Sequence, residues 1–385
     1  MLAQIKVMEY LPSTSEVLVA SSMPTPGEGG VAYRCLASAG SKDGLVVAVE
    51  DPATSDAEGD DLNVVLLRIP TLSAGEGGDE DGAAHAEVVV RLSSPDAGSA
   101  FVRAARWKPV LDEDDSDDDE GSGGVGGAST AAAALPPLVT VAPDFVAVWA
   151  VRPGDAAAEI TASWRPAAFG PPLTAAAFDP SAPCRLVLAA GPDLLEWDGT
   201  SPGSAAVTVV TSAHGGARLL DVHCNPNRQR IAVTAGEDGC ARVWDLKPAA
   251  ADGAALRGPA AALLCLRGHG HWCTAVRFNP FHDQLLVSAG TDGGVCLWSA
   301  PSTSSAPVGE EDEDDGARPP TTSSSRGKAP TDAVLRRWAP HADAVPSSCV
   351  AWSAGSAWVL ATASVEGRVA AREVPPDAKY KILLR

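Results

Sequence analysis

The sequence predicts an all-β fold in which a unit of short strands repeats around a ring, a β-propeller. Residues 214–299 contain the same pattern twice, opening at His214 and His269 and ending at Trp244 and Trp298. Each copy has an Asp-Gly turn between short apolar runs, which is the signature of a WD40 blade. The composition agrees, because 10 Trp suit a fold with one Trp in each repeat, and 37 Gly and 31 Pro suit many tight turns.

Weaker copies of this unit extend over the rest of the chain, and residues 1–385 are expected to form a single WD40 β-propeller. The six expected blades cover residues 1–70, 87–151, 173–198, 214–245, 269–298 and 341–373. The sixth has Arg372 in the Trp position, and the tail at 379–385 is expected to form the last outer strand. The prediction is therefore six recognisable blades, or seven if an N-terminal blade is missing from this chain.

Most of the negative charge lies in two inserts rather than in the repeats. The formal net charge is −20, and the runs 112–120 and 310–315 hold eight and six acidic residues. We expect an acidic, Gly-rich disordered insert at 111–130 and an acidic, Ser- and Pro-rich one at 300–332, because such segments bury too little apolar area to order themselves. The strand order puts both on the face opposite the one that carries the repeated His residues and their polar partners. No nucleic-acid partner is expected, since phosphate neutralisation needs clustered Lys and Arg.

The cysteines and the apolar segments bear on compartment and cofactors. Eight Cys without a CxxC pair favour free thiols in a reducing compartment. His269-Gly-His271 with Cys265 and Cys273 nearby is a weak alternative, a metal site, but His269 is needed by the repeat. The most apolar stretch, 131–151, is interrupted by prolines, and no signal-peptide pattern opens the sequence. We expect a cytoplasmic protein with no cofactor, no metal and no direct membrane insertion.

The repeated polar residues predict two structural tetrads. Their members are His214, Thr234, Asp238 and Trp244, and His269, Ser288, Asp292 and Trp298. A buried imidazole between a carboxylate and a hydroxyl has both ring nitrogens satisfied. Ser288, Asp292 and His269 also have the composition of a catalytic triad. The structural interpretation is favoured because the set recurs in each repeat and ends in Trp, so we predict no catalytic residue and no enzyme.

Two surface features suggest where partners bind. His271 and Trp272 follow His269 in a loop on the rim of the face that carries the tetrads, and an exposed Trp beside polar residues is typical of an interface anchor. The alternative is that Trp272 packs against the neighbouring blade. The second acidic run, beginning Glu310, Glu311 and Asp312, would suit a basic ligand, and its alternative is a solvated spacer.

The C-terminal part resembles a specific group of WD40 proteins. The resemblance rests on Asn225-Pro-Asn-Arg-Gln and the run 236–245, on His269-Gly-His-Trp and His282-Asp-Gln-Leu-Leu, and on the ending 378–384. These segments resemble the family of proteins that interact with the endosome-associated recycling protein (EARP) and Golgi-associated retrograde protein (GARP) complexes. The match is good over 165–385 and loose before it.

The resemblance implies a non-enzymatic scaffold that binds an endosomal or trans-Golgi vesicle-tethering complex and supports endosomal recycling and retrograde transport. It implies tethering-complex subunits and a small Rab-type GTPase as partners, a monomeric subunit of larger assemblies, and a peripheral position at the trans-Golgi network and endosomes. The family supplies no binding residue to carry over. The alternative function is a histone- or chromatin-complex-binding WD40 propeller, because acidic propellers suit basic tails.

Overall fold

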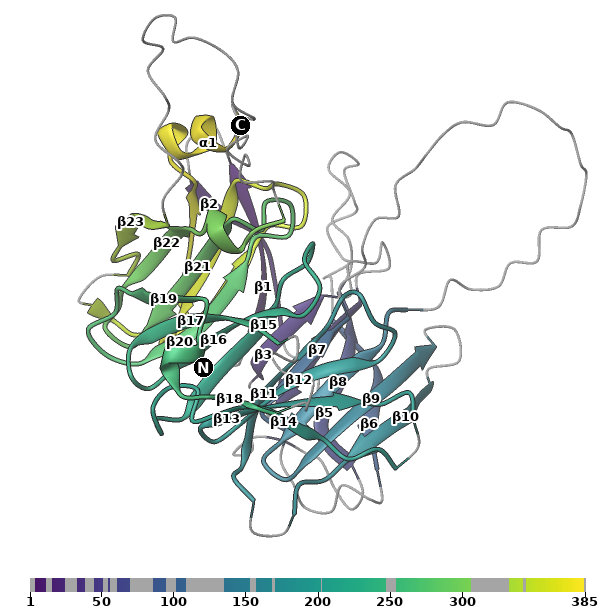
Figure 1. Cartoon of the computed structure of the whole chain (residues 1–385). Helices are drawn as coiled ribbons and strands as arrows, with labels where there is room; N and C mark the ends of the chain where they lie inside the picture. The colour runs from purple at the N-terminus through teal and green to yellow at the C-terminus, as the bar shows by residue number, and fades with distance from the viewer. Residues whose placement is uncertain are drawn as a thin grey trace, which may run out of the picture.

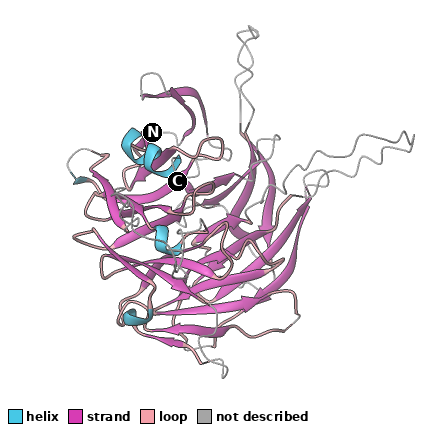
Figure 2. Ribbon diagram, turned by 45° about the horizontal axis from the view of Figure 1, so that its top comes forward, coloured by secondary structure: helices cyan, strands magenta, loops and turns pink. Residues whose placement is uncertain are grey.

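The computed structural model describes residues 4–11, 16–24, 33–38, 45–50, 55, 61–69, 86–94, 102–108, 135–152, 157–167, 170–201, 203–246, 254–305, 332–341 and 344–383. Within them, six sheets stand around a common axis as the blades of a propeller (Figure 1). Figure 2 shows the same blades from a tilted view, with strands far outnumbering helices. The predicted all-β propeller with six blades is confirmed.

Each blade runs from an innermost strand at the axis to an outer edge. The first blade consists of β3 (Tyr33–Ser38), β4 (Leu45–Glu50), β5 (Asp61–Arg68) and β6 (Glu87–Ser93). The second consists of β7 (Ala104–Trp107), β8 (Leu138–Ala142), β9 (Phe145–Arg152) and β10 (Ala157–Trp164). The third consists of β11 (Leu173–Phe178), β12 (Arg185–Ala190), β13 (Asp193–Asp198) and β14 (Val207–Thr211), with β18 (Leu256–Arg257) added in parallel to β14.

The last three blades contain the repeated pair and the sixth copy. The fourth blade consists of β15 (Leu219–Cys224), β16 (Ile231–Gly236), β17 (Cys240–Asp245) and β19 (Leu264–Arg267). The fifth consists of β20 (Cys273–Phe278), β21 (Leu285–Gly290), β22 (Val295–Ser299) and β23 (Ala333–Trp338). The sixth consists of β24 (Ser347–Trp352), β25 (Val359–Ser364) and β26 (Val369–Glu373). Two 3₁₀ turns, η1 (Pro259–Ala261) and η2 (Pro301–Thr303), lie in connections.

The N-terminal part differs from the expected single blade at 1–70. Strands β1 (Gln4–Leu11) and β2 (Glu16–Pro24) pair only with each other in the described part of the chain, and β2 lies beside β26. Strand β6, which the sequence assigned to the second blade, pairs with β5 and completes the first. Strand β5 has six buried central residues, so its open edge would leave backbone groups unpaired next to the core. Strand β6 pairs along this edge and covers it.

The tail is a helix as far as Leu383, rather than the outer strand expected at 379–385. Helix α1 (Pro376–Leu383) begins at a Pro whose fixed φ suits a first helical turn. Ala378 is buried and Ile382, one turn later, packs against the same cluster between the fifth and sixth blades. This apolar contact at helical spacing favours the helix over a strand. No helix in the described ranges is long and apolar enough to cross a membrane.

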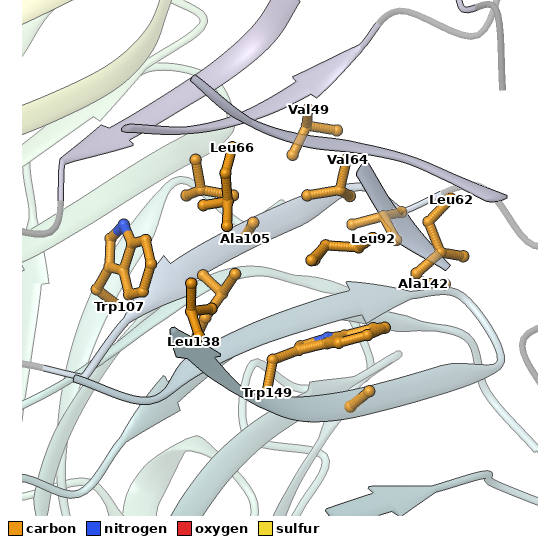
Figure 3. Close-up of a cluster of buried hydrophobic side chains, with 14 of the residues drawn as sticks. Val49, Leu62, Val64, Leu66, Leu92, Ala105, Trp107, Leu138, Ala142 and Trp149 are labelled. Carbon is orange, nitrogen blue, oxygen red and sulfur yellow. The ribbon is translucent and has the colours of Figure 1, made fainter. Parts of the chain in front are cut away.

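The hydrophobic core lies between neighbouring blades rather than in one central mass. Figure 3 shows the cluster where the first blade meets the second, with Val64 and Leu66 of β5 facing Trp107 and Trp149 of the second blade. Trp149 is 1 % exposed, and its Nε1 donates to Thr140 Oγ1 at 2.9 Å. Burying both the ring and its one polar group makes this residue a main contributor to the packing of the blades.

We therefore predict that Trp149→Ala lowers the free energy of unfolding by about 3–5 kcal/mol, because the cavity adds to the lost transfer energy. Urea denaturation followed by circular dichroism measures it. The control is Tyr380→Ala in α1, whose side chain is 61 % exposed and should change stability by less than about 0.5 kcal/mol. Equal stabilities for the two variants would contradict the assigned role of Trp149.

Candidate functional site

The fourth blade carries a hydrogen-bonded chain formed by the four residues of the first predicted tetrad. The loop that enters β15 holds His214, whose Nδ1 lies 2.6 Å from Asp238 Oδ1 and whose Nε2 lies 2.8 Å from Thr234 Oγ1. Trp244 Nε1 donates to the same Oγ1 at 2.9 Å. The chain runs from the turn between β16 and β17, through the imidazole of the entering loop, to the middle of the sheet, and so fixes that loop to its blade.

The fifth blade repeats this arrangement with Ser in place of Thr. His269 Nδ1 lies 3.2 Å from Asp292 Oδ1, and His269 Nε2 lies 2.7 Å from Ser288 Oγ. Trp298 Nε1 donates to Ser288 Oγ at 2.9 Å. Ser288 is 0 % exposed, so its hydroxyl is held inside the blade and does not face a substrate. This geometry favours the structural interpretation of the set over a catalytic triad.

Both sets have an arginine on the carboxylate, but only that of the fourth blade is buried, and the sequence analysis missed it. In the fifth blade the exposed Arg337 donates to Asp292 at 2.7 Å. Arg242 Nη1 donates to Asp238 Oδ2 at 2.5 Å and lies 2.6 Å from His214 Nδ1. The equivalent position in the fifth blade is Cys296, since Thr234 pairs with Arg242 as Ser288 pairs with Cys296. Arg242 is 4 % exposed, so the fourth blade holds a buried ion pair beside its imidazole.

Burial sets the protonation state of both imidazoles. Desolvation lowers the pKa of His214 and of His269, and the hydrogen bonds to Asp238 and Asp292 oppose this only in part. Burial alone would raise the pKa of Asp238, but its hydrogen bonds with His214 and Arg242 outweigh it and hold that pKa well below its usual range. Both rings are therefore neutral at pH 7 beside ionised carboxylates.

Other blades keep only part of the set. In the second blade Trp149 and Thr140 form the Trp–hydroxyl half. In the sixth, His341 Nε2 lies 3.5 Å from Thr362 Oγ1 and Arg372 occupies the Trp position. The complete sets are thus those that the sequence repeat singled out, within the part of the chain that the structure describes.

His271 and Trp272, the predicted surface pair, lie in the loop between His269 and β20. The Trp272 side chain is 40 % exposed, so it does not pack wholly against the neighbouring blade. Its carbonyl accepts Thr291 N–H at 2.9 Å, and the His271 ring lies 5.1 Å from the indole and within 2.6 Å of Thr291 Oγ1. The loop is fixed while the indole faces solvent. Glu310, Glu311 and Asp312 lie outside the described residues.

The opposite face has an exposed aromatic that the sequence did not indicate. Phe281 follows the other end of β20 and is 46 % exposed, and the next residue, His282, stacks on Trp358 of the sixth blade with ring centroids 4.7 Å apart. Asp283 accepts hydrogen bonds from Asn225 of the fourth blade and from Ser305. The His282-Asp-Gln motif therefore joins three blades and the start of the second insert.

The two inserts begin on this same face. The second insert was expected to be disordered over 300–332, yet its first residues are held in place: Thr303 is buried and Ser305 bonds to Asp283. This end of the expected range is ordered because η2 and these hydrogen bonds fix it. All of 111–130 and most of the second insert lie outside the described residues, so their disorder stays a prediction.

The weak metal alternative finds no support in the geometry. His269 is committed to Ser288 and Asp292, and Cys273 is 0 % exposed. No group of three His, Cys, Asp or Glu side chains with metal-binding spacing occurs among the residues described above.

The sequence analysis also did not predict a cluster of charged residues at the axis of the ring. Asp221 of β15 accepts hydrogen bonds from Arg106 Nη2 of β7 at 2.5 Å and from Arg277 Nη1 of β20. Arg106 Nη1 also donates to the carbonyl oxygens of Ala176 and Val222, at 3.1 and 2.8 Å. Residues of the second, fourth and fifth blades therefore meet at one carboxylate, and Arg106 also reaches the third blade.

The two guanidinium groups stabilise the ionised carboxylate. Burial alone would raise the pKa of Asp221, but Arg106 and Arg277 outweigh it and lower the pKa to about 2. A folded-state pKa below the unfolded value of 3.8 means that the unfolded chain binds more protons in acid. This stabilisation is complete above the unfolded value and is lost as the pH falls through the folded value.

For the tetrads, we predict that His269→Ala lowers the free energy of unfolding by about 1–3 kcal/mol at pH 7, because a buried carboxylate and hydroxyl lose their partner. Wild-type stability should fall as the pH drops below 6.5, the ordinary value of His, because the unfolded imidazole binds the proton more readily. This fall should be smaller in the variant. Urea titrations at several pH values measure both effects. The control is His271→Ala, which removes the exposed imidazole two residues away. Unchanged stability in His269→Ala would contradict the structural role.

For the axis, Asp221→Asn should destabilise the protein by about 3–5 kcal/mol, because two partly buried arginines lose their counter-charge. The decline in stability between pH 4 and pH 2 should also be smaller in the variant than in wild type, because Asp238 still contributes to it. The matched control is Glu159→Gln, which removes a carboxylate from an exposed ion pair with Arg152 and should cost less than about 1 kcal/mol. Equal acid profiles for wild type and Asp221→Asn would refute this account.

Comparison with known proteins agrees with this geometry. Residues 138–298, from β8 to β22, match the family model described as the EIPR1 β-propeller. The chain is 29 % identical over 251 residues to EARP and GARP complex-interacting protein 1 of Rattus norvegicus, covering 64 % of this chain and 61 % of that protein. The Homo sapiens protein of the same name is 28 % identical over 252 residues, with the same coverage.

A shorter match involves a nematode protein. EARP-interacting protein 1 of Caenorhabditis elegans is 34 % identical over 166 residues, 43 % of this chain and 42 % of that protein. The chain thus spans 61 % of the length of the mammalian relatives that it matches. The resemblance predicted from the sequence is confirmed: the chain is similar to the EIPR1 β-propeller family over 138–298 and to these EARP- and GARP-interacting proteins at 28–34 % identity.

Proposed function

We propose that this protein is a non-enzymatic WD40 adaptor that binds a vesicle-tethering complex of the EARP or GARP type. The observation that carries the proposal is the similarity to proteins named for that interaction, at 28–34 % identity. The matching family model covers 138–298, which includes the exposed loop of Trp272. The match covers 61 % of the length of the rat relative, and on this basis we extend the partner named for that protein to this chain.

The surface offered to the partner is the loop of His271 and Trp272. A large, rigid aromatic contributes contact area at low cost in conformational entropy. Here the backbone is already fixed through Thr291, and Trp272 is 40 % exposed beside the imidazole of His271. These features are those of an interface hot spot, in which a few preorganised aromatic residues dominate the binding energy.

The non-enzymatic part of the proposal is supported by how the polar side chains are used. Both imidazoles of the complete sets bond to a carboxylate and a hydroxyl, and Ser288 and Thr234 are each 0 % exposed. Because these side chains already have their hydrogen-bond partners, they hold the loops to the blades and are not available to bind a substrate.

We extend the proposal to the cellular role that such an adaptor would have. It would support endosomal recycling and retrograde transport from a peripheral position at endosomes and the trans-Golgi network, as one monomeric subunit of a larger assembly that includes a small Rab-type GTPase. The acidic run of Glu310, Glu311 and Asp312 would then act outside the Trp272 surface, because Ser305, the last described residue before it, lies on the opposite face.

Affinity capture of the tagged full chain tests the function and the surface separately. We predict that wild type recovers subunits of the tethering complex and that Trp272→Ala reduces their recovery about tenfold or more, as expected for a hot spot. The matched control is Phe281→Ala, an exposed aromatic at the other end of β20, which should leave recovery unchanged.

Three outcomes distinguish the possible errors. Reproducible absence of tether subunits from the wild-type capture would refute the function. Equal recovery with wild type and Trp272→Ala would leave the function standing and refute the surface. Salt-sensitive recovery of histones instead would favour the chromatin-binding alternative.

A further inference from the structure

The same main-chain hydrogen bond recurs in the last three blades, on the face that carries the tetrads. In each blade the residue after the second strand donates its N–H to the carbonyl oxygen of the residue before the innermost strand. The three pairs are Glu237 with Arg218 at 3.0 Å, Thr291 with Trp272 at 2.9 Å, and Val365 with Pro346 at 3.0 Å. Because the bond is equivalent in each blade, each pair occupies the same place on this face of the ring.

The chemistry of this place changes from charged to apolar along the ring. In the fourth blade, Arg218 and Glu237 form an ion pair at 2.5 Å. In the fifth blade the place is taken by Trp272, which is 40 % exposed, and in the sixth by Val365, which is 63 % exposed. The residue bonded to Val365 is a proline, which adds neither charge nor an N–H donor. Two consecutive blades therefore present a large apolar side chain to solvent at the same place.

A hydrogen bond between the blades links these two apolar places. Thr274 Oγ1, two residues after Trp272, donates to the carbonyl oxygen of Ser347 at 2.8 Å. Ser347 directly follows Pro346, whose own carbonyl oxygen accepts the N–H of Val365. Two hydrogen bonds and a few covalent bonds thus connect the indole to the valine. We call the surface formed by Trp272, Pro346 and Val365 the apolar strip.

The charged side chains around the apolar strip neutralise one another. Arg337 Nη2 lies 2.7 Å from Asp292 Oδ2 in the fifth blade, and Arg368 Nε lies 3.3 Å from Glu366 Oε2 in the sixth. The ion pair of the fourth blade borders the strip on its other side. Each of these arginines has a carboxylate partner, so a charged ligand would have to replace an ion pair, whereas an apolar ligand displaces only water.

We propose that the partner-binding surface of Trp272 continues across the blade boundary to Val365 and receives one uncharged, apolar segment of a tethering-complex subunit. This inference rests on the proposed function and adds to it a second blade and the chemistry of the partner's contact. Covering the indole and the valine side chain removes apolar area from water. The ion pairs at the borders correspond to the polar rim that surrounds the apolar centre of a protein interface.

The first test is affinity capture of the tagged full chain with Val365→Ser, measured as recovery of tether subunits. Recovery should fall about tenfold, the change that about 1.4 kcal/mol represents, because burial of a valine contributes at least this much. Serine keeps the N–H that bonds to Pro346, and circular dichroism checks the fold. The matched control is Val207→Ser in the outer strand β14 of the third blade. Val207 is 62 % exposed, and its replacement should leave recovery unchanged.

Two further measurements address contact and chemistry directly. A photo-crosslinking amino acid placed at position 365 should label a tether subunit in the captured complex, and the same amino acid at position 207 should not. Recovery by wild type should stay constant between about 0.1 M and about 0.5 M NaCl, because an apolar contact is not screened by salt.

The outcomes separate this inference from the function on which it rests. Absence of tether subunits from the wild-type capture would overturn both. Wild-type recovery that is unchanged by Val365→Ser, or a lack of cross-linking from position 365, would overturn the extension to the sixth blade and leave the proposed function standing. Recovery that falls steeply with salt would overturn the uncharged nature of the partner segment.

Discussion

The geometry of the ring depends on a single carboxylate, that of Asp221. It lies on the innermost strand of the fourth blade and accepts hydrogen bonds from arginines of the second and fifth blades. Arg106 reaches on to a carbonyl of the third. Apolar contacts between blades are non-directional and tolerate sliding, whereas charge-assisted hydrogen bonds require a defined geometry. The axis cluster therefore sets the rotation of four blades relative to one another, in spite of the desolvation that buried charges cost.

The two His–hydroxyl–Asp–Trp sets have a different role, because each attaches the entering loop to its own blade. His214 and His269 fix the loops that enter β15 and β20, and these loops present side chains that the repeat leaves free to differ. Strand β20 illustrates the result, because Trp272 precedes it and Phe281 follows it. Each is held through its main chain, by Thr291 and by Asn279 respectively, so one rigid strand exposes an aromatic on both faces of the propeller.

Sequence reasoning succeeded where a constraint repeats and failed where it does not. The two His–hydroxyl–Asp–Trp sets could be predicted because the fold requires the same bonds in each blade. Arg106, Asp221 and Arg277 could not, because they are 115 and 56 residues apart and meet only when the ring forms. Charged residues in otherwise apolar inner strands were the available signal.

The outer strands and the tail were also difficult, for a related reason. Strands such as β14 are partly exposed and short, so their sequences carry little apolar periodicity. Helix α1 is decided by its contact with the cluster that contains Ala378, which depends on blades far away in sequence. The first blade was misdivided because β6 is separated from β5 by a long connection.

The ends of the second insert have a consequence for how this chain can change. Ser302 donates to Asp332 through its N–H and its hydroxyl, at 3.1 and 2.6 Å, so the two ends of the insert are clamped together at the edge of the fifth blade. The entropy of closing such a loop grows only with the logarithm of its length, and a doubling costs about 0.6 kcal/mol. Residues can therefore be gained or lost between these two positions at almost constant stability, which makes this the point where a new module can be inserted without disturbing the propeller.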